Sequence, residues 1–264
     1  MRVAHLKRNY IRYSETFLYS FLEHAVDHYP TVLTDIAQNL DAFPIDCRYL
    51  LRGHEADTLV RGSGPRVLHR FLQEMRFPGC YQEMLSRQPF DLLHAHFGPA
   101  GCDALALKRA LDLPLITSFY GVDASKLLRI PSIRDRYLDL FNESERIIVL
   151  GPDMAARLAA AGCPQSKIVV LHLGVDLDQF VYKKRSCAGD ESVIVLFCGR
   201  LVEKKGPLDL LEAFARLESE HRNVILRYVG SGPLQKAVRE RVRTLGLHSR
   251  VSLKEAVSHD QVIE

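Results

Sequence analysis

The chain has 264 residues, of which 47% are hydrophobic and 25% charged, so it can bury a large core and is long enough for two domains. Its 35 basic and 32 acidic residues leave a net charge of +3, and basic residues do not alternate with aromatic ones, so we expect no nucleic-acid partner. Six cysteines lie far apart without a CxxC pair, and no apolar stretch approaches the ~20 residues that span a bilayer, so we expect a cytoplasmic protein with reduced thiols.

The N-terminal part of the chain predicts an amphipathic helix that starts behind Ser14. Serine is a residue type that caps helices, because its hydroxyl accepts a hydrogen bond from a backbone N–H of the first turn. The apolar residues after Ser14 recur at helical spacing and form one stripe. This stripe consists of Phe17, Leu18, Phe21, Leu22, Ala25 and Val26.

Residues 61–76 combine arginines with an apolar stripe at helical spacing. Arginines that border such a stripe are typical of helices that lie on anionic membranes. One interpretation is that this segment contacts anionic lipid at the inner face of the plasma membrane, or a lipid-linked acceptor. The other is that it forms an ordinary surface helix. The arginines are Arg61, Arg66, Arg70 and Arg76, and the stripe is Leu68, Phe71, Leu72 and Met75.

The middle of the chain alternates apolar runs with helical segments, which predicts a parallel sheet. Continuous apolar runs are typical of strands that are covered on both faces, and four occur at 91–97, 114–119, 146–150 and 167–173. Between them, 100–111 and 152–161 are rich in Ala, Leu and Arg and predict helices. The second helix is followed by Gly162 and Pro164, which are typical stop residues.

His94 and His96 are separated by one residue on the first of these four runs. On a strand this spacing puts both rings on the same face, as a metal site needs. No third ligand is evident near them in the sequence, so we expect no metal site. His96 is instead expected to line the cleft or to bond a backbone carbonyl.

A polar, charged segment follows the last of the four runs, and we place a linker there at 183–192. The first domain is then expected at 1–182 and the second at 193–264. The second domain predicts the order strand, helix, strand, helix, strand. Its 72 residues (264 − 193 + 1) are fewer than the ~100 to 150 of a nucleotide-binding α/β domain, so we expect it to be incomplete.

Residues 193–206, VIVLFCGRLVEKKG, predict an anion-binding loop. A buried strand ends at Gly199, and Arg200 and Lys205 follow within one short loop. Gly206 lets the backbone approach a ligand, and a helix N-terminus beyond it favours negative charge, so we expect a phosphate there. From spacing alone, a solvated turn with basic residues remains the alternative.

Gly230 and Gly232 follow the predicted strand VILRYV and resemble the start of a nucleotide-binding loop. The full GxGxxG pattern needs a third glycine at position 235, where this chain has Gln235. The sequence therefore disfavours a dinucleotide-dependent oxidoreductase.

Five segments, in order along nearly the whole chain, resemble landmarks of the family 4 retaining glycosyltransferases. They are SETFLYSFLEHA (14–25), LLHAHFGPAG (92–101), PLITSFYGVDAS (114–125), VVLHLGVDLDQF (169–180) and GRLVEKKGPLDLLEAFARL (199–217). The resemblance implies an α/β fold of the GT-B type, with two Rossmann-like parallel-sheet domains. It also implies retaining transfer of a hexose from a nucleotide-diphosphate donor to a polysaccharide or lipid-linked acceptor, without a metal or other cofactor.

The same resemblance leaves the activity of this chain alone open. In the family, a pair of glutamates spaced eight apart binds the donor ribose and sugar, and a final helix crosses back to the first domain. Neither is present in this sequence, which is therefore expected to be C-terminally truncated. The alternative to a transferase is a remnant or fragment that binds acceptor or partner without turnover.

In the second domain, the resemblance assigns Arg200 and Lys205 to the donor diphosphate, with Gly199 and Gly230 beside the donor. In the first domain it places Tyr120 where the family usually has a histidine against the transferred sugar. A phenol can hydrogen-bond but carries no charge near neutral pH. Tyr120 and Asp123 are the expected catalytic residues.

The loop after the first strand is expected on the acceptor side of the site. It contains Ser14, Glu15 and Thr16, and His96 is expected to line the same cleft. Glu15 is the residue expected to contact acceptor hydroxyls, because loop chemistry gathers at the carboxyl ends of the strands in such sheets.

Overall fold

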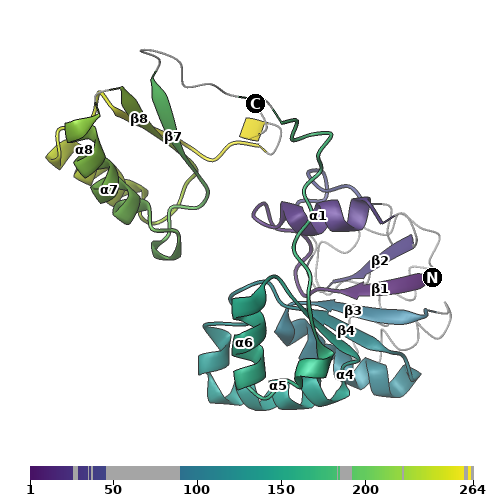
Figure 1. Ribbon diagram of the computed structural model, residues 1–264. Helices are drawn as coiled ribbons and strands as arrows, with labels where there is room; N and C mark the ends of the chain where they lie inside the picture. The colour runs from purple at the N-terminus through teal and green to yellow at the C-terminus, as the bar shows by residue number, and fades with distance from the viewer. Residues whose placement is uncertain are drawn as a thin grey trace. The chain divides into compact units, whose positions relative to one another are not determined.

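The computed structural model describes residues 1–25, 29–34, 36, 38–45, 90–182, 184, 192–221, 223–258 and 261–262 (Figure 1). The chain divides into two compact units, unit 1 at Met1–Val175 and unit 2 at Asp176–Glu264. The predicted lipid-facing segment at 61–76, with all four arginines, lies outside the described residues, as does most of the predicted linker at 183–192.

Unit 1 contains a six-stranded sheet in which every neighbouring pair of strands is parallel. The strand order is β2-β1-β3-β4-β5-β6. This confirms the parallel sheet that the apolar runs predict. The strands are β1 (Arg2–Leu6), β2 (Tyr29–Leu33), β3 (Leu92–His96), β4 (Leu115–Ser118), β5 (Arg146–Val149) and β6 (Ile168–Val170).

Helices pack against this sheet, and α4 contacts β3, β4 and α5 (Figure 1). The helix α5 is absent from the sequence expectations. Only Tyr137, Leu140 and Phe141 of α5 are buried, so its apolar stripe is narrow and is hidden among charged residues. The helices of unit 1 are α1 (Thr16–Glu23), α4 (Gly98–Leu111), α5 (Pro131–Glu143) and α6 (Pro152–Ala160), with short 3-10 helices η2 (Leu127–Arg129) and η3 (Gln165–Lys167).

The predicted cap of the first helix is wrong. The residue at the N-cap of α1 is Glu15 rather than Ser14, and no side chain caps the helix. Ser14 is exposed one residue earlier. The Glu15 carboxylate does not cap the helix, because it accepts hydrogen bonds from the Lys7 ammonium and from the backbone N–H of Arg12.

Unit 2 contains a three-stranded parallel sheet in the order β7-β8-β9. Leu211 and Phe214 of α7 pack with Leu226 and Tyr228 of β8 to form its core. The predicted alternation of strands and helices in this part of the chain is confirmed. The elements are β7 (Val193–Cys198), η4 (Glu203–Lys205), α7 (Pro207–Glu220), β8 (Val224–Val229), α8 (Gln235–Thr244) and β9 (Val251–Lys254).

The described residues include several helices and three cysteines. Within the described ranges, every helix is too short or too polar to cross a lipid bilayer. Three cysteines fall in those ranges, Cys102, Cys163 and Cys198, and all three are free thiols.

Gly230 joins the loops that follow β7 and β8, and we expect alanine there to destabilise unit 2. Its φ is +143°, and a Cβ at this position would lie 2.0 Å from the carbonyl oxygen of Gly199. Gly246 is a matched control, because its φ is also positive (+70°) but nothing lies within 4 Å of an added Cβ. Alanine at either position costs free energy because the backbone φ is positive. Only in Gly230→Ala does the added Cβ also collide with the backbone of Gly199.

In urea unfolding followed by circular dichroism, Gly230→Ala should therefore cost about 1–3 kcal/mol more than Gly246→Ala, the usual range for overpacking. Equal losses in the two variants would contradict the close backbone approach at Gly230.

Candidate functional site

Three strands of unit 1 bring polar side chains to one edge of the sheet. The strands β1, β3 and β4 are neighbours and parallel, so their carboxyl ends meet at that edge. Lys7 follows β1, His96 ends β3 and Tyr120 comes shortly after β4. Open α/β sheets bind their ligands outside the carboxyl ends of the strands. This edge is therefore the candidate site of unit 1.

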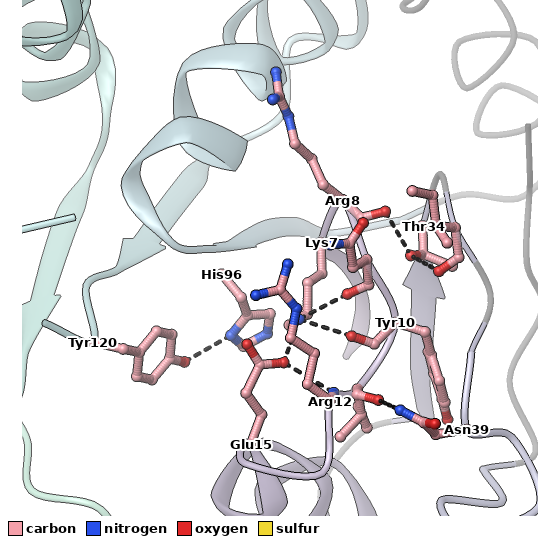
Figure 2. A network of polar contacts seen from close by, with 12 residues as sticks. Lys7, Arg8, Tyr10, Arg12, Glu15, Thr34, Asn39, His96 and Tyr120 are labelled. Atoms are coloured by element: carbon pink, nitrogen blue, oxygen red, sulfur yellow. Dashed lines mark hydrogen bonds and ion pairs between the residues drawn. The ribbon is translucent and has the colours of Figure 1, made fainter. Parts of the chain in front are cut away.

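Lys7 is the centre of a polar network at this edge (Figure 2). Its ammonium donates to the Glu15 carboxylate at 2.6 Å and to the carbonyl oxygens of Asn9 at 2.7 Å and Tyr10 at 2.8 Å. The Lys7 side chain is 6% exposed and that of Glu15 is 12% exposed. Burial lowers the pKa of Lys7, and the hydrogen bond to Glu15 opposes that shift. A buried ion pair thus pins the loop between β1 and α1.

The same loop is held by further hydrogen bonds. The Glu15 atom Oε2 that meets Lys7 also accepts the N–H of Arg12 at 3.1 Å. The Asn39 amide donates to the carbonyl of Ile11 at 3.0 Å. Among the described residues, no partner engages the other carboxylate oxygen of Glu15, Oε1. In the predicted acceptor-side loop, Ser14 is exposed, whereas Glu15 and Thr16 are partly buried.

His96 and Tyr120 lie in contact at this edge, although the sequence assigned them to different parts of the site. The Tyr120 hydroxyl lies 2.7 Å from Nδ1 of His96, and its ring packs against Phe17 of α1 at 5.0 Å between centroids. Burial lowers the pKa of His96 well below its ordinary value, and the nearby His94, His5 and Lys7 lower it further. Burial also raises the pKa of the Tyr120 phenol. Both groups are therefore neutral near pH 7.

A third histidine, His5, lies beside the pair His94 and His96. The sequence analysis missed this third histidine. His5 of β1 pairs in register with His94 of β3, so its ring lies on the same face of the sheet as His94 and His96. All three are buried, and one ring nitrogen from each lies within 4.8 Å of the others. His94 also lies 2.8 Å from the hydroxyl of Ser118 through Nε2. The expectation that no third ligand is nearby is therefore wrong.

Asp123 is fully buried, and its carboxylate accepts hydrogen bonds from four backbone N–H groups. The donors are Gly98 (3.1 Å), Tyr120 (3.1 Å), Gly121 (2.8 Å) and Ala124 (3.1 Å). Burial raises the pKa of Asp123, and these hydrogen bonds oppose the shift. The carboxylate ties the loop after β4 to the start of α4 and so fixes the backbone that carries Tyr120.

Phe97 has an unusual backbone conformation at the same edge. Its φ is +75°, which bulky residues rarely adopt and which costs on the order of 1–3 kcal/mol. The Phe97 ring packs against Tyr120 at 4.8 Å between centroids, and the Lys7 ammonium lies 5.3 Å from the ring centroid. The strained residue therefore places an aromatic ring close to both the Lys7 ammonium and the Tyr120 ring.

In unit 2, the candidate site is the loop between β7 and α7. Arg200 and Lys205 are exposed on this loop, and in the described part of the chain neither side chain has a hydrogen-bond or ion-pair partner. Gly206, with φ +61°, is the N-cap residue of α7, so no side chain caps the helix N-terminus. Cations and uncapped N–H groups in one loop form an arrangement suited to an anion.

The glycines of this site have a structural explanation. Gly199 and Gly230 lie in backbone contact, since an added Cβ on Gly230 would collide with the Gly199 carbonyl. The loops are further joined by hydrogen bonds from the Leu201 N–H to Ser231 at 3.0 Å and from the Leu234 N–H to Leu201 at 3.1 Å. The loop that carries Arg200 is therefore held in place by the loop after β8.

Comparison with known proteins identifies both parts of the chain. Residues 24–179, more than half of the chain, match the family described as Glycosyltransferase Family 4, and residues 178–264 match Glycosyl transferases group 1. Similar curated proteins include the putative colanic acid biosynthesis glycosyltransferase WcaL of Salmonella typhimurium, at 30% identity over 170 residues. The amylovoran biosynthesis glycosyltransferase AmsK of Erwinia amylovora is 28% identical over 172 residues.

These matches cover only part of each protein. They involve 63% of this chain and 42% of WcaL, and 64% of this chain and 42% of AmsK. The chain thus spans about two fifths of the length of the curated relatives it matches.

Solved structures share the fold at low sequence identity. Anabaena Alr3699/HepE in complex with UDP matches with a TM-score of 0.74 at 16% identity, covering 99% of this chain and 71% of that chain. The lipopolysaccharide outer core galactosyltransferase WaaB matches with a TM-score of 0.63 at 13% identity, covering 100% of this chain and 70% of that chain. The predicted α/β fold of the GT-B type, with two parallel sheets, is therefore confirmed.

Proposed function

Because this chain belongs to glycosyltransferase family 4, we propose that it serves retaining transfer of a hexose from a nucleotide-diphosphate donor to a polysaccharide or lipid-linked acceptor. The acceptor class is supported by the relatives, which are named for colanic acid and amylovoran biosynthesis. The donor class is supported by HepE, whose structures contain UDP or UDP-glucose. The observation that carries the proposal is the family match over both units.

In unit 2, the proposed role of Arg200 and Lys205 is to bind the donor diphosphate. The Arg200 guanidinium can pair two phosphate oxygens at once, whereas the Lys205 ammonium acts as a point charge. The charge on the leaving diphosphate grows in the transition state, so cations placed there stabilise the transition state more than the ground state. Gly199 and Gly230 are proposed to let the donor approach the backbone of the two joined loops.

In unit 1, the proposed contact with the transferred sugar is Tyr120. Its hydroxyl is held by His96 at 2.7 Å, and neither group carries charge near neutral pH, so Tyr120 can orient a sugar hydroxyl without acting as a base. Asp123 is better assigned as a positioning residue than as a catalytic one, because four backbone N–H groups occupy its carboxylate.

Glu15 is the proposed acceptor contact. Its Oε2 atom is engaged by Lys7 and Arg12, and this leaves Oε1 to accept a hydrogen bond from an acceptor hydroxyl. The neighbours Ser14 and Thr16 belong to the same proposed acceptor-side loop. In a retaining reaction that hydroxyl attacks on the face from which the diphosphate leaves, and the departing phosphate can take its proton. Little side-chain base chemistry is then required.

A calorimetric screen of UDP, GDP and ADP against this chain tests the donor class. We expect one nucleoside diphosphate to bind with a stoichiometry of one, and its sugar nucleotide to compete with it for the same site. A chain that binds none of the three more tightly than inorganic pyrophosphate would contradict the proposal. The sugar nucleotide that competes is then the one to assay for transfer.

A further inference from the structure

We propose that His5, His94 and His96 form a binding site for one divalent transition-metal ion, with zinc as the best match. The three residues come from the neighbouring parallel strands β1 and β3, and His5 pairs in register with His94. A two-residue step then places His96 on the same face. The site is therefore built on two neighbouring interior strands of the sheet, and its ligands are set by strand register and not by a loop.

The spacing of the ring nitrogens suits zinc. One nitrogen from each ring lies within 4.8 Å of the others, and Nδ1 of His5 lies 3.0 Å from Nε2 of His96. Tetrahedral zinc with bonds of about 2.0–2.1 Å holds its nitrogen ligands roughly 3.4 Å apart. Small side-chain rotations would bring the three nitrogens to that separation. Three imidazoles are also a ligand set that zinc binds in proteins.

Two of the three histidines also form hydrogen bonds of the kind that orient metal-binding histidines. One nitrogen of His96 is held by the Tyr120 hydroxyl at 2.7 Å, and one nitrogen of His94 by the Ser118 hydroxyl at 2.8 Å. In metal sites, such second partners fix the tautomer and the direction of the coordinating nitrogen. Here the partner of His96 is the same Tyr120 that is proposed to meet the sugar, so a bound metal would also stiffen that residue.

The three histidines are surrounded by an aromatic ring and a cation whose charge is compensated. Phe21 of α1 covers the cluster, with its ring at 5.9 Å from His5, 5.7 Å from His94 and 5.9 Å from His96. Phe21 is itself 42% exposed, so this ring lies at the surface of unit 1. The Lys7 ammonium, which acts electrostatically on His96, is paired with Glu15 at 2.6 Å, and this pairing compensates its charge.

The proposal is tested with zinc alone, so it needs neither donor nor transferase activity. Chelator-treated chain is titrated with Zn²⁺ in competition with a chromogenic chelator. We expect one equivalent to bind, and His96→Gln and His5→Gln to weaken binding by about 100-fold or more. His172→Gln is the matched control, because His172 is an exposed histidine of unit 1 outside the cluster, and it should bind zinc like the unchanged chain.

Cobalt gives a readout that does not depend on the folding of the variants. Co²⁺ added to the unchanged chain should produce visible bands typical of a low-coordinate nitrogen site, without the near-ultraviolet band of a cobalt–thiolate bond. A thiolate band would assign the metal to cysteine and overturn the proposal. So would the absence of any bound equivalent, or equal zinc affinity in a folded His96→Gln variant. In those cases the three imidazoles serve only as a hydrogen-bonded part of the core.

Discussion

Replacing Lys7 with methionine is expected to lower the free energy of unfolding of unit 1 by about 3–5 kcal/mol. Methionine matches the length of the lysine stem but has no ammonium. The variant therefore leaves the Glu15 carboxylate without its cation, and removes the hydrogen bonds that Lys7 donates to the carbonyls of Asn9 and Tyr10. Removing one partner of a buried pair costs more than the pair contributes, because the remaining charge stays in a poorly solvated place.

Lys108→Met is the matched control for this prediction. Lys108 also forms a lysine–glutamate pair in unit 1, with Glu145 at 2.7 Å, but the two side chains are 19% and 43% exposed. Such a pair is worth about 0–1 kcal/mol. Because the chain contains no tryptophan, unfolding in urea is best followed by far-ultraviolet circular dichroism. A Lys7→Met variant no less stable than Lys108→Met would contradict the assigned role of the ion pair.

The double variant Lys7→Met/Glu15→Gln distinguishes the energetic effect of the ion pair from that of the packing around it. Since no charge is left unpaired, it should lose less stability than the sum of the two single variants. Hydrogen exchange should rise in residues 8–15 in Lys7→Met and stay unchanged there in Lys108→Met, because Lys7 bonds to that loop, whereas the partners of Lys108 are Leu113 and Glu145.

In unit 2, Arg200→Ala and Lys205→Ala are each expected to weaken binding of a nucleoside diphosphate by about 1.5–3 kcal/mol, the scale of hydrogen bonds to charged groups. This corresponds to roughly tenfold to 150-fold in the dissociation constant. Neither side chain has a partner among the described residues, so its removal disturbs little else in unit 2. Calorimetry with UDP measures the loss directly.

Lys204→Ala is the control, because Lys204 is an exposed lysine in the same short helix η4 and lies next to Lys205. It carries the same charge but has no assigned contact with the diphosphate, so its affinity for UDP should change by about 0.5 kcal/mol or less. If all three variants lost the same affinity, only the net charge of the loop would matter, and the individual roles of Arg200 and Lys205 would be refuted.

Much of the fold could be predicted because the central strands β3, β4 and β5 are largely buried. Parallel strands buried in this way appear as continuous apolar runs, and 91–97, 114–119 and 146–150 contain β3, β4 and β5. The helix α5 escaped prediction because only three of its side chains are buried. The cap at Ser14 was wrong because a capping residue type does not show where the backbone first turns helical, which occurs here one residue later.

The candidate site could be predicted only where its residues follow strands in an identifiable motif. The sequence analysis named His96 and Tyr120 as separate candidates after two strands, and the structure brings their side chains into contact. It missed His5 and Lys7, which belong to β1 and the residue after it. Their closeness to β3 depends on the order of strands in the sheet, and hydrophobic periodicity carries no information on that order. A charged residue directly after the first strand, RVAHL, was the available signal for Lys7.

The most direct test of the central claim is an amide chemical-shift map of the ¹⁵N-labelled chain titrated with UDP. The claim is that the loop between β7 and α7 binds the diphosphate of the donor. We predict saturable shifts at the amides of residues 199–201, 206, 208–209 and 230, and their loss in Arg200→Ala. If UDP binds but shifts other amides and leaves these unchanged, the claim that this loop binds the diphosphate is contradicted.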